Sequence, residues 1–177
     1  MIIEPLGGTW TEAERAGLAR VLAECVAGGA SIGFMLPVDA AEIAAYWAKI
    51  EADLAGGWRV LLVARERASG EIVGTVQLAA ESRRNGRHRG EVQKLLVRPG
   101  ARGQGLGREL MAAAEAMAAA RGLTLLFLDT SEGAAGACAL YDALGYVRAG
   151  GIPGWALNPD GKPAANVIYY KTLAPGG

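Results

Sequence analysis

The sequence has little of the residue types that form metal centres, disulfides and histidine-based catalytic sites. Its 177 residues include two cysteines and one histidine. Cys25 and Cys138 are far apart and lie in helical patterns, where a cysteine usually serves as a small buried apolar residue. His88 stands in a basic loop and has no second histidine with which to form a metal cluster. We therefore expect no disulfide and no metal, and metal catalysis is disfavoured.

An excess of charge and long apolar runs are also missing. The formal net charge is zero, from 18 basic and 18 acidic residues, so the chain shows no electrostatic footprint for a nucleic acid. No apolar run approaches the ~20 residues that a membrane helix needs, and the first ten residues lack the pattern of a signal peptide. We expect a cytoplasmic protein without nucleic-acid or membrane partners. The length and the apolar fraction of 51% predict a single domain over residues 1–177.

Hydrophobic periodicity predicts two helices in the first third of the chain. Thr11 to Glu14 is typical of a capping box, and the helix after it should end at Gly28-Gly29. Asp39 should cap a second helix, which ends at Gly56-Gly57 and carries an apolar stripe. We interpret this stripe first as core and only second as a substrate wall. Residues 30–35, between the helices, form either a ligand wall or a packed connection.

Strands and helices alternate in the rest of the chain. Residues 58–67 and 71–80 are predicted as a hairpin. The basic stretch 81–90 should be an exposed turn, which is either merely solvated or steers a carboxylate-bearing substrate. A strand at 91–97, a helix at 109–121, a strand at 123–129 and a short helix at 134–144 follow. Strands at 146–155 and 166–173, linked by a tight turn at residues 158–161, complete the chain.

The stretch 91–111, EVQKLLVRPGARGQGLGRELM, is the most informative in the sequence. It predicts a strand, a glycine-rich turn and the start of a helix. Gly103, Gly105 and Gly107 leave backbone N–H groups uncovered by side chains, and the first N–H groups of a helix have no internal partner. The helix dipole adds about half a positive charge at that end. With Arg98, Arg102 and Arg108 as mobile charges, the turn is suited to a pyrophosphate.

Two common nucleotide motifs do not fit this turn. The dinucleotide fingerprint GxGxxG would need glycine or alanine where Arg108 stands. A Walker loop would need Gly-Lys-Ser/Thr at the appropriate spacing, and none follows. The strands on either side of the helix form a βαβ unit and should therefore run parallel. Asp129 would then lie at the same sheet edge as the turn, where open sheets bind ligands.

The turn resembles the pyrophosphate motif of the GNAT superfamily of N-acetyltransferases, Gln/Arg-x-x-Gly-x-Gly/Ala, which Arg102, Gly105 and Gly107 match. The predicted order of elements is similar to that superfamily from end to end. Within that superfamily, the chain resembles the tabtoxin-resistance branch in three places. These are GGASIGFM at 28–35, the stretch 91–111, and the tail with its segments IPGWALNPDG and VIYYKTL. The resemblance implies the GNAT fold, an α/β (α+β) architecture. Helices flank a central mixed, mostly antiparallel twisted sheet with a splayed parallel pair at 91–97 and 123–129.

The resemblance implies an acetyl-CoA-dependent N-acetyltransferase that acts on the primary amine of a small molecule by direct attack on the thioester. Acetyl-CoA is the co-substrate and no metal is used. In the tabtoxin-resistance branch the acceptor is an amino-acid-like β-lactam, so toxin or antibiotic resistance is an expectation. Two alternatives stay open: a protein or peptide N-acetyltransferase, and a non-catalytic acyl-CoA-binding sensor. A homodimer is a further expectation.

The resemblance also assigns cofactor contacts residue by residue. The strand before the turn would bind the acetyl and pantetheine portions through its main chain, and the turn would bind the pyrophosphate. The residues implied are Leu95, Leu96, Val97, Arg102, Gly103, Gln104, Gly105, Leu106 and Gly107. One position departs from the pattern, because Ala134 stands where an asparagine is often found. That contact is either missing or supplied by Ser131 or Glu132.

Catalytic roles follow from the chemistry of amide formation. An amine with a pKa of about 10.4 must lose a proton before it attacks. The candidate bases are Glu91 and Asp129, which would act through water. Glu91 lies eleven residues before Arg102, the spacing at which the histone-acetylating branch carries its base. The alternative is that Glu91 is a surface strand residue and Asp129 a helix cap. Tyr141 is the candidate proton donor to the CoA thiolate, or else a core tyrosine. A backbone N–H of 95–97 would stabilise the oxyanion. Acceptor contacts are expected from Ser31, Phe34 and Trp155.

Overall fold

The central sheet has seven strands in the order β1-β2-β3-β4-β5-β9-β6. The computed structural model describes residues 1–174, apart from the side chain of Ala135. The elements are β1 (Ile2–Pro5), α1 (Glu12–Ala27), α2 (Ala40–Ala55), β2 (Arg59–Arg65), β3 (Ile72–Ala80), β4 (Arg89–Val97), the 3₁₀ turn η1 (Pro99–Ala101), α3 (Leu106–Ala120), β5 (Leu125–Ser131), α4 (Ala135–Ala143), β6 (Val147–Gly150), β7 (Ala156–Leu157), β8 (Pro163–Ala164) and β9 (Asn166–Thr172).

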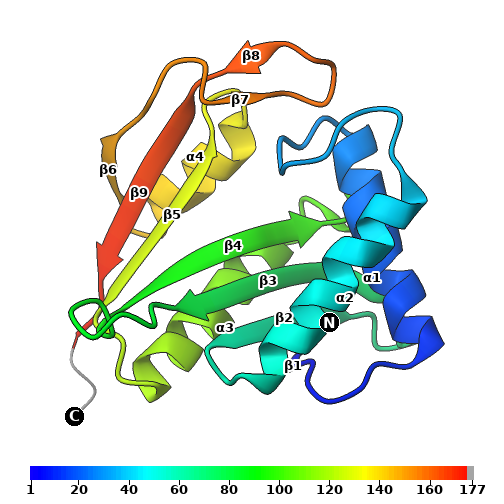
Figure 1. The fold of residues 1–177 in the computed structure, drawn as a ribbon, viewed down its shortest axis with the longest axis horizontal. Coiled ribbons are helices and arrows are strands. Elements are labelled where there is room, and N and C mark those ends of the chain that lie inside the picture. Colours follow the sequence, from blue (N-terminus) through cyan, green and yellow to red (C-terminus); the bar gives the residue numbers. More distant parts are fainter. Residues whose placement is uncertain (175–177) are drawn as a thin grey trace.

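One parallel pair divides a sheet that is otherwise antiparallel. β4 pairs with β5 in parallel, whereas the five other neighbouring pairs in the seven-stranded sheet are antiparallel. In Figure 1 the two parallel strands meet at the lower left and diverge toward the upper part of the molecule. The predicted mixed α/β fold is confirmed, with α3 as the crossover of the βαβ unit.

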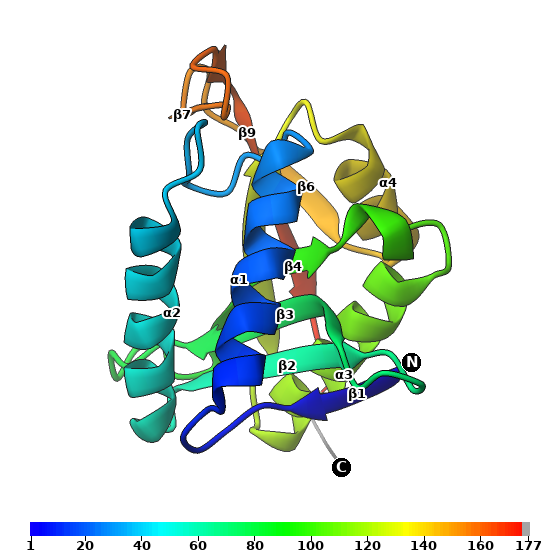
Figure 2. The same cartoon turned by 90° about the vertical axis from the view of Figure 1, so that its right-hand side faces the viewer.

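Helices cover both faces of the β1–β4 half of the sheet. Alternation along β2 sends Leu61 and Val63 to one apolar cluster, which includes the buried residues of α1 and α2. Val60, Leu62 and Ala64 point to the other cluster, which includes the buried face of α3. Figure 1 shows α1 and α2 in front of these strands and α3 behind them, and Figure 2 shows α1 and α2 side by side. The apolar stripe of α2 is core at Ile43, Trp47 and Ile50, which are buried, but Tyr46 and Ile50 also line a cavity described below.

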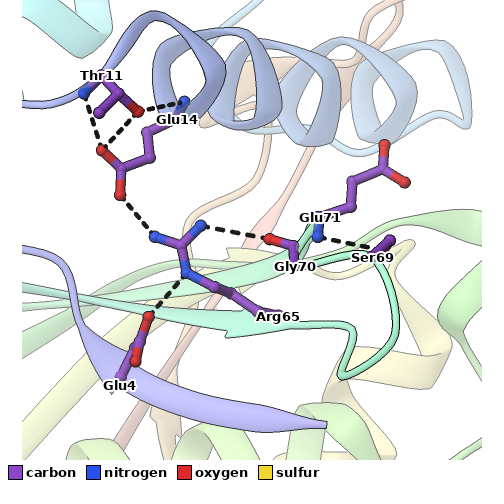
Figure 3. Close-up of polar contacts among 7 residues, drawn as sticks. All are labelled: Glu4, Thr11, Glu14, Arg65, Ser69, Gly70 and Glu71. Carbon is purple, nitrogen blue, oxygen red and sulfur yellow. Dashed lines mark hydrogen bonds and ion pairs between the residues drawn. The ribbon is translucent and has the colours of Figure 1, made fainter.

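The N-terminus of α1 is fixed to the sheet edge by a polar cluster (Figure 3). The predicted capping box is present, with the Glu14 N–H donating to Thr11 Oγ1 at 3.2 Å and the Thr11 N–H donating to Glu14 Oε2 at 2.8 Å. The other Glu14 oxygen accepts from Arg65 Nη2 at 2.7 Å, and Arg65 Nε donates to Glu4 on β1 at 2.7 Å. One arginine therefore connects the edge strand, β2 and the helix.

Several predicted elements differ from the structure. β1 was not predicted as a strand. The strand expected at 146–155 ends at Gly150. The next residue must be a glycine, because a Cβ on Gly151 would lie 2.1 Å from the carbonyl oxygen of Asn166. The turn at 158–161 instead belongs to a separate two-stranded ribbon, β7–β8, closed by the Asn158 N–H on the Lys162 carbonyl at 2.8 Å. α3 begins at Leu106, three residues before the predicted Glu109. Within residues 1–174, no helix has both the length and the apolar character to cross a membrane.

Candidate active site

The site is opened by the divergence of β4 from β5. The two strands pair only where residues 89–91 face residues 125–127, so β4 has no strand neighbour on this side beyond Glu91. Buried backbone N–H and C=O groups require hydrogen-bond partners, and an amide-containing ligand can supply them. The predicted pair at 91–97 and 123–129 is therefore parallel and splayed, with its second strand two residues further along, at Leu125–Ser131.

A β-bulge at Lys94 bends β4 at this point. Thr75 faces Leu96 and Gln77 faces Gln93, so two residues of β4 oppose one residue of β3. Lys94 has a φ of 49° and is the one non-glycine residue with positive φ among the described residues. A left-handed conformation costs roughly 1–2 kcal/mol for a residue with a side chain. The Lys94 carbonyl accepts from Thr75 Oγ1 at 3.0 Å, which holds the strained residue in place.

The glycine turn presents a continuous set of free amides. Gly103 and Gly105 have φ values of 76° and 80°, which favour glycine, and a Cβ at either position would meet no atom within 4 Å. The N–H groups of Arg108 and Glu109 donate to the Gly105 carbonyl. Within residues 1–174, the N–H groups of residues 103–107 have no backbone acceptor. They lie at the N-terminus of α3, where the helix dipole favours an anion.

Of the three arginines expected to be mobile charges near the turn, Arg98 differs from the expectation. Arg98 is already paired: its Nε and Nη2 donate to the two carboxylate oxygens of Glu24 at 2.9 Å each, and its Nη1 lies 2.8 Å from Glu71. It fixes α1 to the sheet and is not a mobile charge for a ligand. Arg102 donates from Nε to the Val97 carbonyl at 3.0 Å. Arg102 and Arg108 line the cavity beside the turn.

This cofactor cavity, as we name it, has a volume of about 630 Å³. Its walls come from the loop after α1, the end of β4, the glycine turn and α4. Of the nine residues expected to bind the cofactor, eight line it; Gln104 is exposed and does not. The Val97 carbonyl already accepts from Arg102 and, at 3.5 Å, from Cys25 Sγ. Of the substitutes considered for the missing asparagine, Ser131 lines the cavity, whereas Glu132 pairs with Arg148 at 2.8 Å.

A second cavity, which we name the acceptor cavity, has a volume of about 590 Å³. Ser31, Ile32, Leu95, Ser131 and Tyr141 are among the residues that line both cavities, so the two adjoin. Its remaining walls come from α2, β2, the bulged part of β4, the end of β5 and the β7–β8 ribbon. The arrangement leaves room for a cofactor and a second ligand side by side, with the shared residues where the two would meet.

Both predicted carboxylates face the acceptor cavity. Burial raises the pKa of Glu91, and the negative charge of Asp129 adds to this effect, while a hydrogen bond from Gln93 opposes it. A carboxyl with a raised pKa is a better proton acceptor once ionised. Asp129 is exposed, and one of its oxygens accepts from Asn166 Nδ2 at 3.4 Å. The two residues are therefore close enough to interact electrostatically, as the hypothesis of a shared base requires.

Tyr141 lies on α4 at the junction of the two cavities and is 6% exposed. Its ring packs against the rings of Tyr146 and Tyr169, with centroids 5.8 and 5.5 Å away. Burial raises the pKa of its phenol, and nearby Cys138 and Asp129 raise it further. The hydroxyl therefore stays protonated at neutral pH and serves as a hydrogen-bond donor.

The three predicted acceptor contacts lie in different surroundings. Ser31 lines both cavities and donates to the Leu157 carbonyl at 3.4 Å. Trp155 lines the acceptor cavity and is 56% exposed. Phe34 is buried and does not line either cavity; it packs edge-on against Tyr46, with ring centroids 5.6 Å apart. Phe34 therefore does not contact a ligand in the acceptor cavity directly, but supports Tyr46, which lines that cavity.

Sequence reasoning missed a polar group on the opposite wall of the acceptor cavity. It consists of Tyr46, Arg59, Gln77, Gln93 and Lys94, linked by hydrogen bonds or stacking. Arg59 Nη1 donates to the side-chain oxygens of Gln77 and Gln93, each at 2.7 Å. A glutamine and a lysine within predicted strands were the available signals, since each interrupts an apolar run.

The divergent strands, the free amides and the adjoining carboxylate-lined cavity define an acyl-CoA-dependent N-acyltransferase. Residues 36–146 match the Acetyltransferase (GNAT) family model, which is more than half of the chain. The chain therefore belongs to this family and is a GNAT N-acetyltransferase that uses acetyl-CoA. Within residues 1–174, no group of three or more His, Cys, Asp or Glu residues is arranged to hold a metal ion.

Solved structures give the same fold over almost the whole chain. A ribosomal-protein-alanine N-acetyltransferase from Brucella melitensis is 24% identical with a TM-score of 0.80, and the match covers 98% of this chain and 100% of that one. A phosphinothricin acetyltransferase from Sinorhizobium meliloti, in complex with acetyl-CoA, is 20% identical with a TM-score of 0.78, and the match covers 99% and 91%. At these identities the likeness establishes the fold alone.

Proposed function

We propose that the protein transfers the acetyl group of acetyl-CoA to the primary amine of a small molecule, such as an amino acid that resembles the β-lactam acceptor of the tabtoxin-resistance branch. The size of the acceptor cavity and the contacts that join two of its walls carry this proposal. Two contacts join the loop before α2 to the β7–β8 ribbon: Ser31 Oγ to the Leu157 carbonyl at 3.4 Å, and the Leu36 N–H to the Pro159 carbonyl at 3.1 Å. A cavity of about 590 Å³ behind these contacts suits a small acceptor better than a protein chain.

In the proposed reaction the described residues hold the acetyl-CoA thioester and move protons. The free amides of residues 103–107 bind the pyrophosphate, and β4 binds the pantetheine through backbone groups beyond Glu91. Glu91 and Asp129 accept the proton of the acceptor ammonium through water. A C–N bond then forms and the C–S bond breaks, while a backbone N–H of β4 stabilises the charge that develops on the thioester oxygen.

Tyr141 donates a hydrogen bond to the departing thiolate. A thiol has a pKa of about 8.5 and a tyrosine one of about 10, and burial raises the pKa of Tyr141 further. Complete proton transfer from the phenol to the sulfur is therefore uphill. We propose that Tyr141 stabilises the thiolate, which takes its proton finally from solvent.

Release of free thiol from acetyl-CoA, measured over a panel of amines, tests the proposed function. The panel contains amino-acid analogues, aminoglycosides and peptides with free N-termini or lysines. Turnover with small amines and not with peptides supports the proposal, whereas turnover confined to peptides supports the protein-modifying alternative. No turnover with any amine, together with intact CoA binding, would identify a sensor. The cytoplasmic location, the homodimer and the role in resistance stay predictions.

A further inference from the structure

We propose that Lys94 and Tyr46 form a subsite for a carboxylate of the acceptor, so that the enzyme acts on amines that carry a nearby carboxylate. This inference rests on the proposed function, which requires only an amine. It concerns the wall of the acceptor cavity formed by α2, β2 and the bulge of β4.

The orientation of Tyr46 follows from a chain of hydrogen bonds that begins at Arg59. A guanidinium can only donate, so the Gln77 oxygen must face Arg59 and the Gln77 amide nitrogen must face away. That nitrogen donates to the Tyr46 hydroxyl oxygen at 2.8 Å. The Tyr46 O–H proton is then left for another acceptor, and among the described residues none accepts it. Because Tyr46 lines the cavity, a ligand can take this proton.

Lys94 supplies the charge of the subsite. Its Nζ donates to the Ile32 carbonyl at 2.9 Å, which occupies one of the three N–H groups of the ammonium. Lys94 forms no salt bridge with the acidic groups that the structure describes, although it lines the cavity and is mostly enclosed. Nζ lies over the Tyr46 ring, 5.6 Å from its centre, so the ammonium and the tyrosine share one wall. Burial lowers the pKa of Lys94, the negative charges of Asp129 and Glu91 partly offset this, and a bound anion would offset it further.

The charges around the cavity match a ligand with both signs. Arg59, whose side chain is 10% exposed, adds positive charge behind Tyr46, and Asp53, 3.6 Å from its Nε, offsets part of it. Glu91 and Asp129 line the same cavity, and Asp129 directly precedes Thr130 and Ser131, which line both cavities. An acceptor with its amine near these carboxylates and its own carboxylate at Lys94 and Tyr46 satisfies both groups. With an amine that lacks a carboxylate, the Lys94 ammonium would feel the charges of Asp129 and Glu91 without forming an ion pair with either of them.

Acetylation of three related compounds tests the inference: the best amino acid of the panel, its α-amide and its decarboxylated amine. We expect the amino acid to have a kcat/KM about 10- to 100-fold above the other two, as for hydrogen bonds to a charged group. Lys94→Met should remove this preference by raising the KM of the amino acid, with the KM of the amine and the affinity for acetyl-CoA unchanged. Tyr46→Phe, which removes only a hydroxyl, should reduce the preference in the same way.

Lys162→Met is the matched control, since Lys162 pairs with Asp160 and its side chain is 80% exposed. It should leave all kinetic constants unchanged. Equal activity of the wild-type enzyme on the three compounds would overturn the subsite, as would variants at both positions that keep the preference. A uniform loss on all three compounds would indicate a merely structural role for Lys94 and Tyr46. Absence of acetylation with every compound would instead refute the proposed function.

Discussion

Replacing single glycines separates the turn's role in binding from its role in folding. Gly105→Ala places a side chain at a φ of 80°, with no atom within 4 Å of the new Cβ. The left-handed conformation alone should therefore cost about 1–2 kcal/mol of folding stability. For a chain of this length, 1 kcal/mol corresponds to a fall in Tm of about 2–4 °C. The variant should also bind CoA more weakly, because the methyl group and any backbone adjustment disturb the free amides.

Gly122→Ala is the matched control, since Gly122 has a φ of 73° and equally open space but does not line the cofactor cavity. It should lose a similar amount of stability and keep wild-type affinity. Gly107→Ala tests the reverse case, a loss of binding without a loss of stability. Gly107 lies inside α3, where alanine is favoured over glycine by roughly 0.5–1 kcal/mol. The new Cβ would lie 3.3 Å from Leu140 on the cavity wall. Its Tm should not fall, while CoA affinity should drop by about tenfold or more.

Differential scanning calorimetry and isothermal titration with CoA measure the two effects on the same samples. The reasoning is refuted if Gly105→Ala and Gly107→Ala bind CoA as tightly as Gly122→Ala does. It is also refuted if Gly122→Ala loses CoA affinity to the same degree, because the effect would then arise from general destabilisation.

Three further predictions concern the base, the tyrosine and the anchor of α1. Glu91→Gln should lower kcat by about 10²–10⁴ and remove the acid limb of the pH profile. In the wild type this limb should lie above the usual glutamate range, because burial raises the pKa of Glu91. An unchanged profile would exclude Glu91 as the base. A raised carboxyl pKa contributes stability at low pH that is lost as pH rises through it, so the same variant should melt higher than the wild type at pH 7 and not at pH 4. Tyr141→Phe should reduce kcat in the thiol-release assay without changing the Kd for CoA, and full activity would leave Tyr141 a core residue. Arg65→Met, which leaves Glu14 unpaired, should cost about 1–3 kcal/mol by chemical denaturation, whereas Arg148→Met, from an exposed pair, should cost less than about 1 kcal/mol; equal losses would contradict the role given to Arg65.

Local signals made much of the fold predictable from the sequence. The capping box at Thr11 and the Asp39 cap each depend on residues within a few positions, and each lies where the sequence places it. The glycine turn was found for the same reason, because conformations with positive φ at Gly103 and Gly105 favour glycine. Periodicity also distinguished the strands of the hairpin from the helices on either side.

The features that the sequence did not reveal depend on contacts between distant residues. The bulge at Lys94 exists only in the register between β3 and β4. Arg98 pairs with Glu24 and Glu71, which are distant in sequence. The sequence alone therefore could not show whether Arg98 is a free surface charge or part of internal ion pairs. Position 151 has no room for a side chain because of the Asn166 carbonyl, which lies 15 residues further along the chain. The side chain of Tyr46 faces both core and cavity, and helical spacing indicates only the first.

Isothermal titration of the purified protein with CoA and with pantetheine, which lacks the pyrophosphate, tests most directly whether the amides of residues 103–107 hold the cofactor. We predict saturable 1:1 binding of CoA and binding of pantetheine that is weaker by at least about a hundredfold, as expected from the loss of several charge-assisted hydrogen bonds. No heat from CoA, or equal affinities for the two compounds, would contradict the assignment of the glycine turn.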